Sequence, residues 1–244
     1  MDVLRARKRK YEESSSSSDS DESSDEASYN GVHLKKISRR DVQFQLPFAA
    51  MICGSQMSGK TTFLEKCIKN VDYIFHPHPR QIVYCFSEIN SSVPKMQKMG
   101  VTTHQGIPTD EELNRWKKPL LLILDDLMLH VDKKYLDLLF TVKSHHKNIG
   151  VIFVTQNTFH PALKTARDNC TYLIFMSSPS SLRQIRDIGA NLFPHKSKEF
   201  MEVYQKCTSI IYGYFIINLH AATPGECRLY RSIFPGEYIH CYEL

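Results

Sequence analysis

The residues with the clearest chemical meaning form a glycine-rich stretch that follows the first apolar run of the chain. Their pattern is G-x-x-x-x-G-K-[ST], in the order Gly54, Ser55, Gln56, Met57, Ser58, Gly59, Lys60 and Thr61. Glycine tolerates positive φ, so a loop with glycine at both ends can turn its backbone amides toward phosphate oxygens. A helix that begins in this loop would add the partial positive charge of its N-terminus. The pattern therefore predicts a binding site for the phosphates of ATP.

Three side chains at the end of this stretch have expected roles of their own. Lys60 should reach the β- and γ-phosphates, and Thr61 should place its hydroxyl on Mg²⁺. Thr62 follows directly and is a further candidate for nucleotide binding. The alternative is a chance glycine turn, which the apolar run before it and the amphipathic stretch after it argue against.

A second candidate site follows the apolar run Leu120–Leu124, which ends in Asp125 and Asp126. A buried strand can deliver a carboxylate to the edge of a sheet where a nucleotide is bound. We expect Asp125 to hold Mg²⁺ through water and Asp126 to orient and deprotonate the attacking water. Many ATPases of this class use glutamate as the base, so the shorter Asp126 is a departure. A polar turn with aspartate capping a helix is the alternative.

A third group of polar residues, Thr155, Gln156 and Asn157, ends an apolar run that begins at Val151. Some ATPases have an extra strand between the strand that precedes the glycine-rich loop and the strand that ends in the acidic residues. A polar side chain at its tip can then bond the γ-phosphate or the lytic water. Gln156 is our first candidate for this role and Asn157 the second, with ordinary turn chemistry as the alternative.

A catalytic arginine would complete such a site, and a neighbouring subunit often donates it. Arg167 is the first candidate because it comes soon after the third group. Ordinary exposure to solvent is the alternative for any single arginine, including the other candidates Arg183, Arg186, Arg228 and Arg231.

The elements that must position these residues can be predicted from hydrophobic periodicity. Strands are expected over Phe48–Cys53, Gln81–Phe86, Leu120–Leu124, Val151–Thr155 and Tyr172–Met176, with a last strand over about Ile210–Ile217. Helices are expected over Thr61–Asn70, Asp132–Lys147, Ser181–Asn191 and Lys198–Lys206. Residues 87–118 should be polar and irregular, with one or two short helices. The alternation of strands and helices predicts an α/β sandwich of three layers around a mostly parallel sheet.

Composition divides the chain into a tail and a folded domain. Residues 1–30 combine the basic cluster Arg5–Lys10 with a serine-rich, acidic stretch, which predicts a disordered tail. Five bases and eight acids give this tail a net charge of −3, so the chain's +5 leaves +8 on residues 31–244. A basic domain favours phosphate-rich partners, although ordinary solubility explains such a charge equally well. The basic cluster is of nuclear-localisation type, with a generic basic arm as the alternative.

The cysteines and the apolar runs of the sequence indicate in which cellular compartment the protein is expected. The seven cysteines include no CxxC pair, which predicts reduced and buried thiols inside the cell. No apolar run approaches the roughly twenty residues of a membrane span, so we expect no membrane partner. The charged N-terminus does not resemble a secretory signal.

The three motifs together resemble one family, the poxvirus-type genome-packaging ATPases of the FtsK/HerA superfamily, with relatives in polinton-type (Maverick) elements and adintoviruses. The likeness covers roughly residues 44–236. Beyond the motifs it includes residues 155–160, where T-Q-N-T-F-H is similar to the family's T-Q-N-x-F-H, and also Arg167, Pro179, Gln184, Pro194 and residues 232–235. The family usually shows Arg-Asp after the first of these prolines, where this chain has Ser180-Ser181, and a later family arginine falls at Ala190. These departures shift the expected catalytic arginine to Arg167.

The resemblance implies a P-loop ATPase domain of the RecA/FtsK-like type over residues 31–244, with ATP and Mg²⁺ as its cofactors. It further implies a homo-oligomeric ring that drives double-stranded DNA into a capsid, with capsid proteins as candidate partners. The location would be intracellular, in the host nucleus if the basic cluster is a signal, and otherwise in the virion or cytoplasm.

Two other functions compete with this interpretation. A nucleotide kinase or similar phosphotransferase would also use a P-loop, but it needs an arginine-bearing lid, and no arginine-rich segment of that kind lies between the expected strands. A non-hydrolysing interaction module would bind ATP only to stabilise its fold. The presence of both Asp125 and Asp126 argues against that module.

Overall fold

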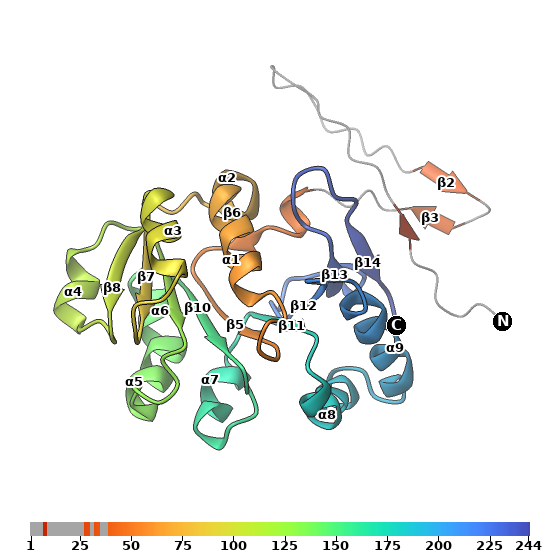
Figure 1. Ribbon diagram of the computed structural model, residues 1–244. Helices are drawn as coiled ribbons and strands as arrows, with labels where there is room; N and C mark the ends of the chain where they lie inside the picture. Colours follow the sequence, from red (N-terminus) through yellow and green to blue (C-terminus); the bar gives the residue numbers. More distant parts are fainter. Residues whose placement is uncertain (1–6, 9–26, 30–31, 35–38) are drawn as a thin grey trace, which may run out of the picture.

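The computed structural model describes residues 7–8, 27–29, 32–34 and 39–244. In it, a twisted sheet runs through the middle of the molecule with helices on both faces (Figure 1). Of the predicted tail, only the short strands Arg7–Lys8 (β1) and Ala27–Tyr29 (β2) are described. The prediction of a disordered tail and most of the basic cluster therefore lie outside the described residues.

The main sheet among the described residues has ten strands in the order β1-β14-β13-β12-β11-β5-β10-β9-β7-β8. Its parallel part consists of Phe48–Cys53 (β5), Gln81–Phe86 (β7), Thr102–Gln105 (β8), Leu120–Asp125 (β9), Ile149–Thr155 (β10) and Tyr172–Met176 (β11). The antiparallel part adds Tyr214–Asn218 (β12), Leu229–Arg231 (β13), His240–Tyr242 (β14) and β1. Two small ladders pair Phe44–Gln45 (β4) with Phe75–His76 (β6), and β2 with Val32–Leu34 (β3).

The helices that flank this sheet are mostly short. They are Lys60–Lys69 (α1), Val71–Ile74 (α2), Ser92–Lys98 (α3), Asp110–Arg115 (α4), Lys133–Leu138 (α5), Ser144–His146 (α6), Lys164–Asp168 (α7), Leu182–Leu192 (α8) and Ser197–Thr208 (α9). The described residues also form four 3₁₀ turns, at Arg39–Asp41, Pro161–Leu163, Pro179–Ser181 and Gly225–Cys227, and a π-helical turn over Leu139–Lys143. Among the described residues, no helix is both long and apolar enough to cross a membrane.

The predicted α/β architecture with a mostly parallel sheet is confirmed, while several details differ from the prediction, including the short helices α2 and α7, which were not predicted. The expected helix over Asp132–Lys147 is interrupted by the π-helical turn between α5 and α6. The expected last strand begins at Tyr214 and not at Ile210, because the chain turns before it, with Tyr212 in the left-handed region at φ 57°. Strands β8, β13 and β14 were not predicted, since they are short and lack a long apolar run.

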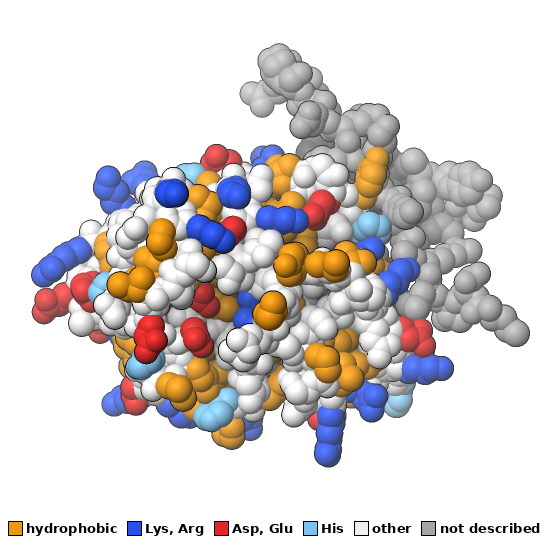
Figure 2. Space-filling model, in the orientation of Figure 1, with side chains coloured by type: hydrophobic (Ala, Val, Ile, Leu, Met, Phe, Trp, Pro, Cys, Tyr) orange, Lys and Arg blue, Asp and Glu red, His pale blue; other side chains and the backbone are white. Residues whose placement is uncertain are grey.

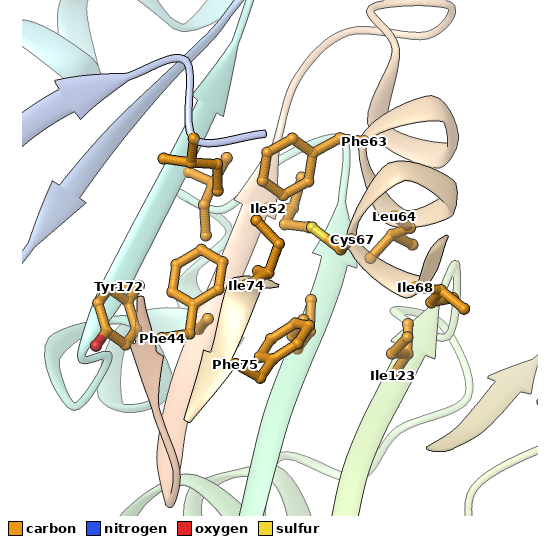
Figure 3. Packing of buried hydrophobic residues seen from close by; sticks show 14 of the residues in the cluster. Phe44, Ile52, Phe63, Leu64, Cys67, Ile68, Ile74, Phe75, Ile123 and Tyr172 are labelled. Atoms are coloured by element: carbon orange, nitrogen blue, oxygen red, sulfur yellow. The ribbon is translucent and has the colours of Figure 1, made fainter. Parts of the chain in front are cut away.

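Alternation along β5 explains how the sheet holds its two helical layers. Ala50 and Ile52 point into one buried cluster, while Ala49, Met51 and Cys53 point into the cluster on the opposite face. On the first face, the apolar stripe of α1 packs over the sheet, and Figure 3 shows it beside Ile52 and Ile123. The stripe consists of Phe63, Leu64, Cys67 and Ile68. Each such side chain contributes about 1.5–3 kcal/mol on burial, so α1 is fixed over the carboxyl end of β5. All seven cysteines are buried, as predicted.

Candidate nucleotide-binding site

The glycine-rich loop lies between the end of β5 and the start of α1, as the sequence predicts. Gly59 has φ 101°, a conformation that glycine adopts readily and that lets the chain enter α1. A Cβ on Gly54 would lie 2.4 Å from the Ser58 hydroxyl oxygen and 2.8 Å from the Met176 Cβ. The backbone therefore passes too close to its neighbours for a side chain at either position, and both glycines are required by geometry.

The Lys60 ammonium group lies over this loop. Its Nζ donates hydrogen bonds to the carbonyl oxygens of Gly54, at 2.7 Å, and Ser55, at 2.8 Å. Burial lowers the pKa of Lys60, while the charges of Cys53, Asp125 and Asp126 act in the opposite direction. A half-buried ammonium group that donates to carbonyl oxygens is suited to donate to phosphate oxygens instead.

Strand order brings the second motif to the same edge of the sheet. Strand β10 lies between β5 and β9, so this chain has the extra strand that the third motif predicted. The register pairs Thr155 with Cys53 on one side of β10 and Val154 with Asp125 on the other. Because all three strands are parallel, their carboxyl ends meet at the glycine-rich loop of residues 54–61, which is called the P-loop below.

Asp125 is placed to share a ligand with Lys60. Burial raises the pKa of Asp125, a hydrogen bond from Tyr84 lowers it, and the charges of Asp126 and Lys60 have further, opposing effects. Because only β10 separates β5 from β9, Lys60 and Asp125 lie at the same edge of the sheet, and the charge of each affects the pKa of the other. An arrangement with these two groups on opposite sides of the domain would have contradicted the sequence analysis.

Tyr84 is a functional candidate that the sequence did not reveal. Its hydroxyl donates a hydrogen bond of 2.5 Å to Asp125 Oδ2, and its ring is fully buried. Tyr84 stands opposite Ile123 in the neighbouring strand, two residues before Asp125 and on the same face of the sheet. The only signal was a lone hydroxyl within the apolar run Gln81–Phe86, and its partner could not be known before the strand order.

The donor set at this edge suits Mg²⁺. Thr61 in the first turn of α1 and Asp125 at the end of β9 offer oxygen atoms, which Mg²⁺ prefers to nitrogen or sulfur. Among residues 39–244 and the short described strands, no group of three or more His, Cys, Asp and Glu side chains could hold a metal ion. A magnesium ion bound to the Thr61 and Asp125 oxygens would complete its coordination with phosphate and water, which is its usual mode in nucleotide sites.

The remaining predicted residues lie around this centre in different ways. Asp126 is exposed and has φ 54°, a conformation that aspartate tolerates better than most residues. Gln156 follows β10, its side chain is exposed, and its carbonyl accepts a hydrogen bond from Cys53 Sγ at 3.6 Å. Asn157 instead uses its Oδ1 to accept from the Phe159 amide at 3.0 Å, which is turn chemistry.

Arg167 contacts its own chain and is only 18% exposed. Its guanidinium donates to the Thr158 carbonyl at 3.2 Å, pairs with Asp168 at 3.4 Å and lies 5.5 Å from the centre of the Phe159 ring. It therefore supports the segment that follows β10. Other candidates lie elsewhere, with Arg183 and Arg186 exposed on α8.

Comparisons with known proteins add information about the fold. No protein-family model matches the sequence, and no curated protein matches it. Among solved structures, the genome packaging NTPase B204 from Sulfolobus turreted icosahedral virus 2, in complex with AMP, matches 81% of this chain and 98% of that chain. The identity is 14% and the TM-score is 0.50.

The fold is that of a P-loop NTPase. The same viral NTPase in complex with ATP-gammaS matches 72% of this chain and 94% of that chain, at 14% identity and a TM-score of 0.49. ATPases 2 and 3 of EssC from Geobacillus thermodenitrificans match 81% of this chain and 40% of that chain, at 14% identity and a TM-score of 0.48. The P-loop NTPase fold that the family resemblance implied is confirmed by the match at a TM-score of 0.50 together with the strand order described above, while its poxvirus-type features stay a prediction.

Proposed function

We propose that this protein hydrolyses ATP to translocate double-stranded DNA, and that it packages a viral or virus-like genome into a capsid as a homo-oligomeric ring. The observation that carries the ATPase part is the meeting of Lys60 and Asp125 at one edge of the sheet, with β10 between their strands. The P-loop NTPase fold shared with the viral packaging NTPase B204 supports the rest.

Each residue of the site would have a distinct task in hydrolysis. Lys60 would exchange the carbonyl oxygens of Gly54 and Ser55 for oxygens of the β- and γ-phosphates. Thr61 and Asp125 would hold Mg²⁺, which supplies positive charge to the phosphates.

Two further side chains would act on the attacking water. Asp126, which is exposed beside Asp125, would orient this water and accept its proton. The Gln156 amide would hydrogen-bond the γ-phosphate or the same water. Arg167 is the proposed arginine finger for a neighbouring subunit, a role in which its guanidinium would exchange the Thr158 carbonyl and Asp168 for the γ-phosphate.

Charge and surface features support the DNA and ring parts of the proposal. Residues 31–244, the proposed ATPase domain, carry +8 by the count given above. On the face in Figure 2, basic side chains are scattered among acidic ones, so this view does not locate a DNA contact. Met57 in the P-loop and Leu129 after β9 expose 90% and 94% of their surface, and such side chains suit a subunit interface. An intracellular location belongs to the same proposal, in the host nucleus if the basic cluster is a signal and otherwise in the virion or cytoplasm.

Phosphate release, measured with and without duplex DNA across a range of protein concentrations, tests this function. The proposal predicts that duplex DNA stimulates ATP hydrolysis and that the rate per subunit increases as the protein assembles. Added salt should weaken DNA binding and with it the stimulation by DNA. Equal turnover with and without DNA in the assembled protein would contradict DNA translocation, and a search for phosphate acceptors would then test the kinase alternative. No phosphate release despite thermal stabilisation by ATP would indicate the non-hydrolysing module.

A further inference from the structure

A cavity of about 200 Å³ lies beside α1, next to the P-loop. The helix contributes Thr62, Phe63 and Lys66 to its wall. The opposite wall comes from the start of β12 and its approach, and from the segment after β13, through Tyr212, Tyr214 and Phe234. Tyr212 and Tyr214 belong to no motif of the sequence, and Phe234 lies in the segment 232–235 that resembles the family.

The direction of β12 explains why the cavity opens at the P-loop. Strand β12 is antiparallel to β11, and its first residue, Tyr214, pairs with Met176, the last residue of β11. The segment that leads into β12 therefore reaches the same edge of the sheet as the carboxyl ends of the parallel strands. A strand in the parallel direction would have brought that segment to the opposite edge.

The cavity and the acidic residues lie on opposite sides of β5. In the sheet order, β10 and β9, with Asp125, follow β5 in one direction, while β11, β12 and β13 follow it in the other. A triphosphate whose γ-phosphate faced Asp125 would extend its α-phosphate in the other direction, across the first turn of α1. Thr62 lies in that turn, directly after Thr61, and lines the cavity. The group attached to the α-phosphate would therefore enter this cavity.

Tyr212 is held at the entrance by an uncommon backbone conformation. Its φ of 57° is rare for an aromatic residue. A Cβ on Gly59 would lie 2.7 Å from Tyr212 Cδ1, so the ring packs directly on the P-loop glycine. Tyr212 is nevertheless 55% exposed, and its neighbour Ile211 is 87% exposed. An aromatic ring that is half covered by the P-loop has a free surface beside the cavity.

Three polar side chains in the wall, Tyr214, Glu237 and Lys66, are paired with one another, whereas the Nε of Arg231 in the same wall is buried with no hydrogen-bond partner among the described residues. The Tyr214 hydroxyl donates to Glu237 at 3.1 Å and accepts from the Ile233 amide at 2.8 Å. Glu237 also pairs with Lys66 at 3.5 Å. Besides Arg231, the wall offers aromatic surface to an entering group, and such surface suits the flat ring of a nucleobase.

We propose that this cavity receives the sugar and base of a nucleoside triphosphate, and that Tyr212 stacks on the base. The proposal rests on the proposed ATP binding and adds the residues that bind the nucleoside. Stacking on one aromatic side chain increases affinity by about 5- to 150-fold. Tyr212 therefore contributes to nucleotide affinity, while the P-loop contributes affinity for the phosphates alone.

Calorimetric titration with Mg²⁺–ATP and, separately, with inorganic triphosphate distinguishes these contributions. Tyr212→Ala should weaken ATP binding by about 10-fold and leave triphosphate binding unchanged. Tyr212→Phe, which keeps the ring, should bind ATP within about threefold of the parent protein. Tyr238→Ala is the matched control, because Tyr238 is 52% exposed and does not line the cavity, and it should change neither affinity.

Three results would overturn the proposal. They are an unchanged ATP affinity in Tyr212→Ala, an equal loss for both ligands, or a loss in Tyr238→Ala that matches that of Tyr212→Ala. A parent protein that binds neither ligand would overturn the proposed ATP binding itself, and this inference with it. A second measurement does not depend on the alanine variant. The fluorescence of 2-aminopurine riboside triphosphate should be quenched on binding to the parent protein and to Tyr212→Phe, and unquenched binding would contradict stacking.

Discussion

The parallel and antiparallel parts of the sheet build the same edge of the molecule by different means. In the parallel part, β5, β9 and β10 each end there, and each is followed or ended by residues that could act on phosphate. In the antiparallel part, β12 begins at this edge, so the segment before it brings Tyr212 to the P-loop. The comparison shows that the acidic residues proposed to act on phosphate lie on one side of β5, and that the aromatic wall of the cavity lies on the other.

This division predicts different kinetic effects from the two parts. Substitutions in the parallel part should lower kcat, because they remove groups that act on the transferred phosphate. Substitutions in the antiparallel part should raise KM with little change in kcat, because they remove contacts made equally in the ground and transition states. The five predictions below test this difference, from the largest expected effect to the smallest.

Lys60→Ala should have the largest effect. It removes the cation that lies over the P-loop, and loss of such a group typically costs about 100- to 1000-fold in kcat. Steady-state phosphate release is the measurement. Lys69→Ala, an exposed lysine at the end of the same helix, should retain the parent rate. A Lys60→Ala protein that hydrolyses ATP at the parent rate would place the catalytic site elsewhere.

Asp125→Asn should lower kcat by about 100-fold, since a metal ion that has lost its carboxylate stabilises less of the phosphate charge. The same change should stabilise the nucleotide-free protein at neutral pH. Burial raises the pKa of Asp125, so the folded state binds a proton more tightly than the unfolded state, and the cost of the charge is present above the folded pKa.

Calorimetric melting of both proteins at several pH values checks this sign. The Tm of Asp125→Asn should exceed that of the parent at neutral pH, and the difference should shrink as acidification protonates the parent's carboxyl group. A lower Tm for Asp125→Asn at neutral pH would show that the buried charge stabilises the fold.

Tyr84→Phe should raise the Mg²⁺ concentration needed for half-maximal hydrolysis by about 10-fold, because groups that orient a metal ligand typically contribute 10- to 100-fold. Tyr135→Phe is the control, since Tyr135 donates a hydrogen bond of 2.7 Å to the Pro108 carbonyl on the other face of the sheet. If both variants show the same dependence on Mg²⁺, the Tyr84 hydroxyl does not orient Asp125 as a metal ligand.

Gln156→Ala and Asn157→Ala should differ although their positions are adjacent. Gln156→Ala should lower kcat by about 5-fold, the value of one hydrogen bond, with an unchanged Tm. Asn157→Ala should lower the Tm and affect kcat less, because its side chain accepts the Phe159 amide within the turn. Measurements of kcat and Tm on both proteins test this difference. A larger fall in kcat for Asn157→Ala than for Gln156→Ala would make Asn157 the catalytic amide.

The smallest effect belongs to the antiparallel part. Glu237→Gln keeps an acceptor for the Tyr214 hydroxyl but removes the charge that pairs with Lys66. A partly exposed ion pair contributes little, so KM for ATP should change by only about 2-fold and kcat should not change. Initial rates over a range of ATP concentrations provide both constants, and a clear fall in kcat would remove the distinction between the two parts.

The same two parts differ in how much the sequence could predict. Strands β5, β7 and β11 have the predicted bounds because strands buried on both faces are continuous apolar runs. The P-loop and the acids after β9 could be found because their chemistry requires particular residues in a fixed order. Strands β13 and β14 have three residues each, too few to show a period.

Some site residues depend on neighbours that are distant in the sequence. The contact between Tyr84 and Asp125 exists because β7 lies beside β9, and no local pattern encodes that pairing. The packing of Tyr212 on Gly59 follows from the antiparallel direction of β12 and from a left-handed residue, and the sequence predicted a continuous strand at this place. Arg167 was predicted from its position soon after the third group and from the family resemblance, and its contacts with the segment after β10 emerged only from the structure.

A crystal structure of the protein with Mg²⁺ and a non-hydrolysable ATP analogue would test the central claim most directly. The account predicts the β- and γ-phosphates within hydrogen-bonding distance of Lys60 Nζ, and the magnesium ion between the Thr61 hydroxyl and Asp125. It also predicts the base against the Tyr212 ring, on the far side of β5 from the acids. A nucleotide bound away from residues 54–61, or a magnesium ion that neither Thr61 nor Asp125 approaches, would contradict the account.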